Sequence, residues 1–207
     1  RQRWHVSSPT VREALEAGEQ LGKHPIILAD QADNTGGGAP GDSTEVLQTF
    51  LDLHLENAVV LYMVDPTVAD AAHTAGVGGT VSMPVGGKSA PIQGPPVEMN
   101  AEVIAVADGA FAYDGPMFAG LTGNMGRSAW LRQDGVNVVV VQAREQPFDP
   151  AFARTLGIDC AAMKYISVKS SAHFRSGFEK IAGSIHNVNA RAIHTHDFSQ
   201  LQYRRCS

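Results

Sequence analysis

The chain is poor in the residues that mark several protein classes. Only two of its 207 residues are cysteines, Cys160 and Cys206, so the sequence implies no disulfide framework. Such sparse cysteine use favours a reducing, cytoplasmic setting. No apolar run approaches the roughly 18 residues of a membrane span. The net charge of −5 argues against a nucleic-acid-binding surface, which is normally basic.

Several motifs of catalysis and nucleotide binding are missing as well. The Walker pattern G-x-x-x-x-G-K-[ST] does not occur, and neither does H-E-x-x-H or C-x-x-C. No serine stands in a G-x-S-x-G elbow, so Ser-His-Asp chemistry cannot be argued from the sequence. The sequence therefore lacks the common motifs of nucleotide binding, of zinc binding and of serine hydrolases.

One loop, residues 30–43, concentrates acids and glycines. An apolar run at 25–29 precedes it and predicts a buried strand. The residues after it predict a helix over 43–56, capped by Asp42 with Glu45 three positions on. A strand, a glycine loop and a helix form a common ligand-binding corner of α/β proteins. The acids, the asparagine and the glycines of the loop are Asp30, Asp33, Asn34, Gly36, Gly37, Gly38, Gly41 and Asp42.

This loop allows several interpretations. A phosphate cradle usually has a lysine, which the loop lacks, and its consecutive glycines argue against a dinucleotide fingerprint. A polar site is the third interpretation, with Asp30, Asp33 and Asn34 orienting a substrate or a partner loop. The glycines would then allow close approach of the backbone. The alternative is a purely structural turn, in which Asp33 and Asn34 act as turn formers.

The remaining pattern predicts an α/β fold. A helix from Ser8-Pro9 to about residue 23, with Ser8 as its cap, opens the chain. The continuous apolar run at 58–64 is typical of a parallel strand covered on both faces, and Asp65-Pro66 starts a helix to about residue 74. An extended segment is expected at 80–85, and the alternation of apolar and polar residues over 97–106 predicts a half-exposed strand. Segments at 128–132 and 136–142 flank Asp134-Gly135, a hairpin signal, so the middle is expected to be antiparallel.

The last third returns to alternating elements. We predict a helix over 149–156, a strand over 165–169, a helix over 173–182 capped by Ser170-Ser171, and a strand over 185–190. The fold class is therefore α/β, with a mixed sheet, flanking helices and an antiparallel central hairpin region.

A second group of candidate residues follows the strand at 165–169. Lys169 and Arg175 would supply positive charge for a carboxylate or an oxyanion, near a helix start that adds its own positive potential. His173 could donate a hydrogen bond there. The alternative is that His173 caps or packs and that both cations are solvated.

Two alternating histidines, His194 and His196, suggest a metal site, since imidazole is a common zinc ligand. No residue nearby completes a ligand set at a recognised spacing. An exposed polar turn before Asp197 is the favoured interpretation.

Seven blocks of the sequence share their order and spacing with known proteins: residues 25–30, 33–42, 65–66, 75–78, 86–88, 169–175 and 203–205. Together they resemble one family, the MlrC-type zinc metallopeptidases (the microcystinase C family). The similarity runs in order and spacing over nearly the whole chain and covers the family's C-terminal domain only. Residues 1–207 are thus expected to form a single MlrC C-terminal-like domain, a segment of a longer chain. Thr35 departs from the family's usual proline, the usual Pro-rich end is missing, and His194 and His196 fall on no family motif.

The resemblance implies a zinc-dependent peptidase or amidohydrolase that acts on small, often cyclic or linearised, peptides. Its zinc ligands are expected in an N-terminal domain, which would be the partner of this segment, and none is expected here. Zinc would polarise the scissile carbonyl and lower the pKa of a bound water. We expect no nucleic-acid or membrane partner, and a homo-oligomer is compatible with the resemblance.

Within this segment we expect a supporting role in catalysis. His173, Lys169 or Arg175 would hold a substrate carboxylate or the tetrahedral oxyanion. The loop would shape the cleft wall or the contact between domains, through Asp30, Asp33, Asn34, Gly36, Gly37, Gly38 and Asp42. The alternative is a non-catalytic α/β module for ligand binding or a domain interface.

Overall fold

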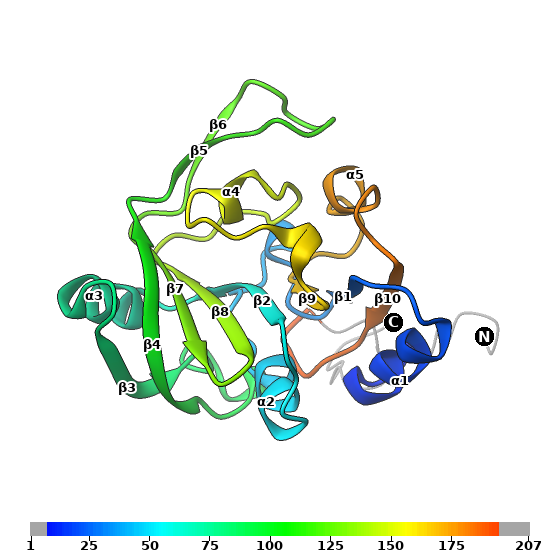
Figure 1. Ribbon diagram of the computed structural model, residues 1–207, viewed down its shortest axis with the longest axis horizontal. Coiled ribbons are helices and arrows are strands. Elements are labelled where there is room, and N and C mark those ends of the chain that lie inside the picture. Colours follow the sequence, from blue (N-terminus) through cyan, green and yellow to red (C-terminus); the bar gives the residue numbers. More distant parts are fainter. Residues whose placement is uncertain (1–7, 195–207) are drawn as a thin grey trace, which may run out of the picture.

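The computed structural model describes residues 8–194 and has a mixed α/β fold built on an eight-stranded sheet (Figure 1). The strand order is β10-β1-β9-β2-β8-β7-β4-β3. A separate two-stranded ribbon pairs β5 (Ala110–Ala112) with β6 (Thr122–Asn124). The strands of the large sheet are β1 (Ile26–Asp30), β2 (Ala58–Val64), β3 (Thr80–Val85), β4 (Val97–Ala107), β7 (Ser128–Gln133), β8 (Val136–Val141), β9 (Tyr165–Val168) and β10 (Ser184–Val188).

The sheet has a parallel half and an antiparallel half, as the sequence predicts. Strands β10, β1, β9, β2 and β8 run parallel, and β8, β7, β4 and β3 pair antiparallel. The β7–β8 hairpin turns at Asp134, whose φ of 53° fits a tight two-residue loop. Along β4, the exposed Glu98, Asn100 and Glu102 alternate with buried residues, which confirms the predicted half-exposed strand.

Helices cover both faces of the sheet (Figure 1). The first face packs against α1 (Val11–Leu21), α2 (Glu45–Asp52) and α3 (Pro66–Ala75). The second face packs against the short helices α4 (Ala151–Arg154) and α5 (Arg175–Phe178) and the base of the β5–β6 ribbon. The parallel strands are therefore buried on both sides, which explains their continuous apolar sequences.

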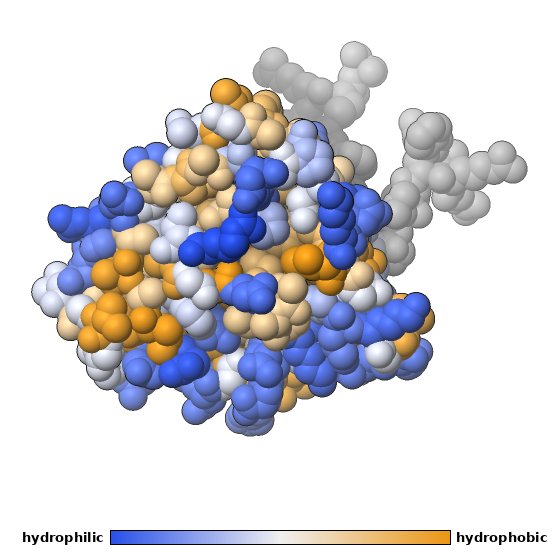
Figure 2. Space-filling model, turned by 45° about the horizontal axis from the view of Figure 1, so that its top comes forward, coloured by the Kyte–Doolittle hydropathy of each residue, from blue (hydrophilic) through white to orange (hydrophobic). Residues whose placement is uncertain are grey.

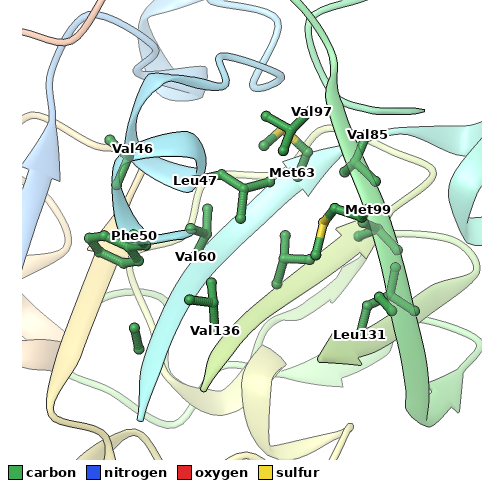
Figure 3. Packing of buried hydrophobic residues seen from close by; sticks show 14 of the residues in the cluster. Val46, Leu47, Phe50, Val60, Met63, Val85, Val97, Met99, Leu131 and Val136 are labelled. Atoms are coloured by element: carbon green, nitrogen blue, oxygen red, sulfur yellow. The ribbon is translucent and has the colours of Figure 1, made fainter. Parts of the chain in front are cut away.

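The core on the first face is built by alternate residues of each strand. In β1, Ile26 and Leu28 lie in this core, whereas Ile27 lies in the core of the second face. Figure 3 shows Leu47 and Phe50 of α2 packed over the sheet. Each such fully buried side chain contributes about 1.5–3 kcal/mol relative to an exposed one.

A register shift in β2 affects which face of the sheet receives the Tyr62 side chain. The pairing of β2 with β8 shifts between Val60 and Met63. As a result Leu61 and Tyr62 both belong to the core of the second face. The Tyr62 hydroxyl lies 3.3 Å from Thr35 Oγ1, a residue of the acid and glycine loop.

Two helix starts differ from the prediction. Helix α1 begins at Val11, because Thr10 and Glu13 form a capping box, and Ser8 is not its cap. Helix α2 begins at Glu45 after Thr44, so the predicted start at residue 43 with Asp42 as cap is wrong. The Asp42 carboxylate is occupied by distant donors instead.

The two late helices are shorter than predicted. Helix α4 spans four residues, and so does α5, which follows Phe174 without a side-chain cap. Ser170 and Ser171 therefore do not cap a helix over 173–182. A Cβ on Gly177 would come within 2.7 Å of the Phe148 carbonyl oxygen, so α5 packs closely on the loop at 148–150, which precedes α4. Tertiary packing, together with this poor helix former, limits the helix to one turn.

The surface carries hydrophobic residues in separate patches. On the face shown in Figure 2, hydrophobic side chains are interrupted by hydrophilic ones. Between residues 8 and 194, none of the helices combines the length and the apolar character needed to cross a bilayer.

Candidate functional site

The carboxyl ends of the parallel strands meet at one edge of the sheet. Ala29 of β1 and Leu61 of β2 are both in register with Val168 of β9. The ends of these strands therefore lie side by side, which brings together Asp30, the last residue of β1, and Lys169, the first residue after β9. In open α/β sheets this edge is the usual place for ligand sites.

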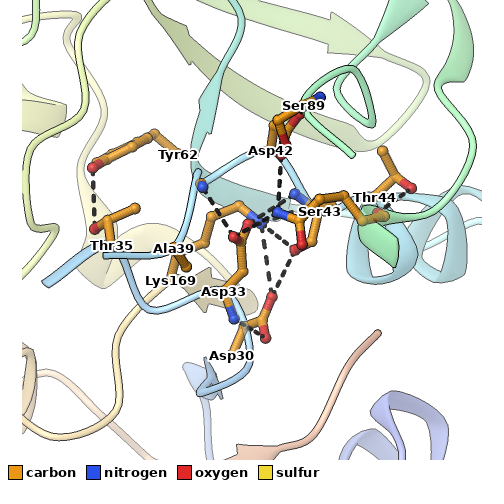
Figure 4. A network of polar contacts seen from close by, with 12 residues as sticks. Asp30, Asp33, Thr35, Ala39, Asp42, Ser43, Thr44, Tyr62, Ser89 and Lys169 are labelled. Carbon is orange, nitrogen blue, oxygen red and sulfur yellow. Dashed lines mark hydrogen bonds and ion pairs between the residues drawn. The ribbon is translucent and has the colours of Figure 1, made fainter. Parts of the chain in front are cut away.

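An ionic cluster is buried beneath the loop (Figure 4). The Lys169 ammonium lies 2.9 Å from Asp33 Oδ2 and 3.7 Å from Asp30 Oδ2. It also donates to Ser43 Oγ at 2.7 Å and to the Ser43 carbonyl at 3.0 Å. The side chains of Lys169, Asp30 and Asp33 are 1%, 0% and 0% exposed. One buried cation thus compensates two buried carboxylates.

The pKa values of the two carboxylates, Asp30 and Asp33, are shifted in opposite directions. Burial raises the pKa of Asp30, because that carboxylate is fully enclosed and lies farther from the Lys169 charge, with Asp33 adding repulsion. Burial also acts to raise the pKa of Asp33, but the closer Lys169 charge and several hydrogen bonds outweigh it and lower that pKa. The pKa of Lys169 is raised, since the attraction of both acids exceeds the effect of burial.

Asp33 fixes the path of the loop. Its Oδ1 accepts from the Gly41 amide at 2.9 Å and from Gln93 Nε2 at 2.8 Å. Its Oδ2 accepts from the Ser43 amide at 2.8 Å, besides the Lys169 ammonium. Two ends of the loop that lie ten residues apart are held together by this one carboxylate.

Asp42 connects the loop to a distant turn. Its Oδ2 accepts from the amides of Lys88 and Ser89 at 2.9 and 2.8 Å. Its Oδ1 accepts from Ser89 Oγ at 2.6 Å and from Gln93 Nε2 at 2.9 Å. These donors replace the helix cap that the sequence suggested, because they satisfy both oxygens.

Asp65 and Lys88 extend the same network. Lys88 Nζ lies 2.7 Å from Asp65 Oδ2, which also accepts from the Gly86 amide at 2.9 Å. Asp65 Oδ1 accepts from the Val68 amide at 3.2 Å and caps α3, which starts at Pro66 as predicted. Blocks that lie far apart in the sequence, at 33–42, 65–66, 86–88 and 169, therefore build one polar core.

The middle of the loop faces outward. Gly36, Gly37 and Gly38 are exposed, while Thr35 is buried and Asn34 half-buried. Asn34 Oδ1 accepts from the Gly36 amide at 3.1 Å and caps a single 3₁₀ turn, Thr35–Gly37. The exposed part of the loop is thus backbone, and its acids lie on the inner side.

The segment after β8 is fastened to this glycine turn. Arg144 Nη1 donates to the carbonyls of Gly38 and Ala39 at 2.9 and 3.1 Å. Thr35 Oγ1 donates to the Glu145 carbonyl at 2.9 Å. The Glu145 amide donates to the Tyr62 hydroxyl at 2.9 Å, and burial raises the pKa of that phenol, so it stays protonated.

This attachment sets two side chains against the glycines. Gln146 lies over Gly36, where a Cβ would come within 2.4 Å of the Gln146 amide group. Gln146 Nε2 is 2.9 Å from His173 Nδ1, and His173 is exposed. On the other side, the His194 ring lies where a Cβ on Gly37 would be, at 2.5 Å. The lack of side chains at positions 36 and 37 is what admits these two groups.

The structure therefore separates the predicted site residues into two sets. Lys169, Asp30, Asp33 and Asp42 are enclosed, whereas His173 reaches the exposed glycine turn through Gln146. Arg175 stands on α5, half-buried, with its guanidinium carbon 5.4 Å from the centroid of the Phe174 ring.

The donor set of the enclosed acids does not fit a zinc ion. Both Asp33 oxygens and both Asp42 oxygens already accept hydrogen bonds, and Asp65 is paired with Lys88. Within residues 8–194, no group of three or more His, Cys, Asp or Glu side chains is arranged to hold a metal ion. His194 is described, but His196 lies outside the described residues, as does the 203–205 block.

The glycine spacing needs one correction. Gly36, Gly38 and Gly41 match the dinucleotide spacing G-x-G-x-x-G, so the consecutive glycines do not exclude that pattern. In that motif the glycines open a helix whose N-terminus receives the pyrophosphate. Here α2 begins at Glu45, and Asp33 accepts the Gly41 amide, so the pattern builds no such site.

Two residues in these contacts were missed in the sequence. Gln93 bridges Asp33 and Asp42, and Gln146 contacts His173. Gln146 could have been found from its place after a buried parallel strand, where functional loops begin. Gln93 follows an edge strand and gives no such signal.

A hollow of about 530 Å³ opens beside α5. Its wall includes Ser176 of α5, whose hydroxyl donates to the His173 carbonyl at 2.9 Å. The wall is partly apolar, at Pro116 and Ile181. It carries charges of both signs, because Arg154 is paired there with Asp114 and Lys180 lies on the same wall as Asp149 and Asp159.

Comparison with known proteins agrees with the resemblance seen in the sequence. A family model described as MlrC C-terminus matches residues 28–205. Microcystinase C from Sphingomonas sp. is 29% identical over 171 residues, which make up 83% of this chain and 33% of that protein. A crystal structure of a candidate metallopeptidase from Mesorhizobium sp. BNC1 is 27% identical and has a TM-score of 0.85. The match covers 98% of this chain and 40% of that one, so the chain spans well under half the length of either relative.

Proposed function

Because the chain belongs to the MlrC family, whose C-terminal model it matches over residues 28–205, we propose that it is the C-terminal domain of a zinc-dependent peptidase or amidohydrolase. Its substrates would be small peptides, and its partner would be an N-terminal domain of the same protein. The names of the two relatives, a microcystinase and a candidate metallopeptidase, support hydrolysis of peptide bonds. Residues 1–207 would act as one domain in that enzyme.

The zinc ion would be held by the N-terminal domain. The enclosed acids of this chain already accept hydrogen bonds from amides, Ser89 and Gln93, or pair with Lys169 and Lys88. The domain described here would contribute the second wall of the cleft.

One observation carries the proposal: an exposed histidine stands beside an exposed glycine turn at the carboxyl edge of the parallel strands. In this arrangement His173 would donate a hydrogen bond to the oxyanion that forms when a peptide carbonyl is attacked, or to a substrate carboxylate. The backbone of Gly36, Gly37 and Gly38, with Asn34 at its start, would line the cleft without side chains in the way.

Arg175 and the enclosed residues would have different roles. Arg175 would bind a substrate carboxylate, since its guanidinium offers paired donors on the same short segment as His173. We assign Lys169, Asp30, Asp33 and Asp42 to holding the loop, because their polar atoms are enclosed and already bonded. The hollow beside α5 would receive part of the peptide.

The proposal is tested by replacing His173 with alanine in the full-length enzyme and measuring hydrolysis of a panel of small linear and cyclic peptides. Loss of an oxyanion donor is expected to lower kcat on the order of 10²-fold. His54→Asn is the control, since His54 is exposed at the far end of α2 and asparagine tolerates its φ of 49°.

The control should retain activity within about twofold, because changes at exposed sites away from the site seldom matter. If His173→Ala retains activity within the same range, the role proposed for His173 is wrong. In that case the exposed turn would be better explained as an interface with the N-terminal domain.

A further inference from the structure

The contact between Gln146 and His173 has a defined chemical direction. The amide nitrogen of glutamine carries two hydrogens and no lone pair for accepting, so it can only donate. It lies 2.9 Å from His173 Nδ1. With the amide nitrogen on this side, Nδ1 is the acceptor in the pair, and in a neutral imidazole the proton is then on Nε2.

The proton on Nε2 has a functional consequence. His173 is exposed, so the nitrogen on the other side of its ring from Gln146 is available to a ligand. An Nε2–H group can donate to a carbonyl oxygen, an oxyanion or a carboxylate. The opposite tautomer would offer only a lone pair, which repels all three.

Gln146 is itself held in place on both sides. Its backbone follows Arg144 and Glu145, which are bonded to Gly38, Ala39 and Thr35 of the loop and to Tyr62 of β2. Its side chain lies over Gly36, where any Cβ would overlap it. These contacts limit the rotamers of Gln146 before any substrate arrives, which is how a supporting residue orients a catalytic one.

We propose that Gln146 is a positioning residue, which fixes His173 in the Nε2–H tautomer and so makes it a hydrogen-bond donor to a peptide carbonyl or carboxylate. Gly36 belongs to the same arrangement, because only a residue without a Cβ leaves room for the Gln146 amide. The assignment rests on the proposed function, since it explains how the histidine of that site is prepared.

The test reads the tautomer and the activity separately. In protein labelled at the histidine ring nitrogens, the ¹⁵N shifts of His173 are measured at alkaline pH and identified by their loss in His173→Ala. Wild type should show a protonated Nε2. In Gln146→Glu the carboxylate can only accept, so the proton should move to Nδ1.

Activity of the full-length enzyme should follow the tautomer. Gln146→Glu removes the outward donor and should lower kcat on the order of 10²-fold, with a smaller change in KM. Gly36→Ala should displace Gln146 and lower kcat in the same direction. Gln20→Glu, which adds the same charge on the exposed side of α1, is the matched control and should change neither the shifts nor the rate.

The outcomes distinguish the two claims. An unprotonated Nε2 in wild type, or unchanged shifts in Gln146→Glu, overturns the assignment of Gln146, even if His173→Ala is inactive. A moved proton with unchanged hydrolysis supports the control of the tautomer by Gln146 but contradicts the donor role of His173 in the proposed function.

Discussion

The inner and outer halves of the loop at residues 30–43 differ in almost every property. The inner half holds Asp30, Asp33 and Asp42, which are buried and bonded to Lys169, Gln93 or backbone amides. The outer half is the run of exposed glycines at 36–38. The side chains of Gln146 and His194 pack against this run, at Gly36 and Gly37.

The difference teaches that crowding of acids and glycines in a sequence does not make a single site. The acids organise the backbone from within, since each buried carboxylate must be matched by donors. The glycines admit side chains from other loops on the outside. Stability should therefore depend on the inner half, and chemistry on the outer half.

The largest expected effect comes from removing the buried cation. Lys169→Met keeps much of the side-chain volume but leaves Asp30 and Asp33 without a counter-charge, and should destabilise the fold by about 3–5 kcal/mol. Urea unfolding at neutral pH measures this loss.

A double variant checks the cause. Lys169→Met combined with Asp33→Asn removes one charge of each sign and should be more stable than Lys169→Met alone, because the second change relieves the first. A loss below about 1 kcal/mol in Lys169→Met would show that the cluster is not what holds the loop.

The next largest effect should be a difference between Asp33 and Asp30 in their contributions to stability. Asp33→Asn should cost about 3 kcal/mol, since it breaks the pair with Lys169, whereas Asp30→Asn should cost less than about 1 kcal/mol. Burial is the main influence on the pKa of Asp30, so removal of its charge offsets the loss of its hydrogen bonds.

The effects of Asp33→Asn and Asp30→Asn on the free energy of unfolding should also change with pH, in opposite directions. The pKa of Asp33 is lowered in the fold, so its contribution is present above the unfolded value near 4 and is lost as pH falls through the folded pKa. The pKa of Asp30 is raised, so its contribution is present at low pH and is lost as pH rises. Urea unfolding of wild type and both variants from about pH 3 to 8 measures the two trends. Parallel trends for both variants would contradict the assignment.

The smallest expected effect on activity concerns Arg175. Arg175→Gln should raise KM about tenfold for peptides that carry a free terminal carboxylate, which corresponds to the loss of one charge-assisted hydrogen bond. Amidated versions of the same peptides are the internal control and should be unaffected. An equal change in both sets would show that Arg175 does not read the carboxylate.

Much of the fold could be predicted because local pattern and burial agree. The run at 58–64 is apolar throughout and lies in the middle of a parallel half covered on both faces. The alternation along β4 and the Asp134 turn gave the antiparallel half in the same way. In these elements the sequence neighbours of each residue determine its structure.

The site could be predicted only in part, because its contacts join distant segments. Asp42 has the spacing of a helix cap, yet its donors come from residues 88–93, more than 40 positions away. Ser170-Ser171 likewise resemble a cap, but α5 is limited by its packing on the loop at 148–150. Spacing along the chain carries no information about such partners.

The separation of the two halves is tested most directly by a crystal structure of the full-length enzyme with a non-hydrolysable small peptide. A polar atom of the ligand should lie within about 3.2 Å of His173 Nε2 and close to the Gly36–Gly38 backbone, with Lys169 still bonded to Asp33. A ligand bonded to Lys169 or Asp33 in place of their present partners would contradict the account.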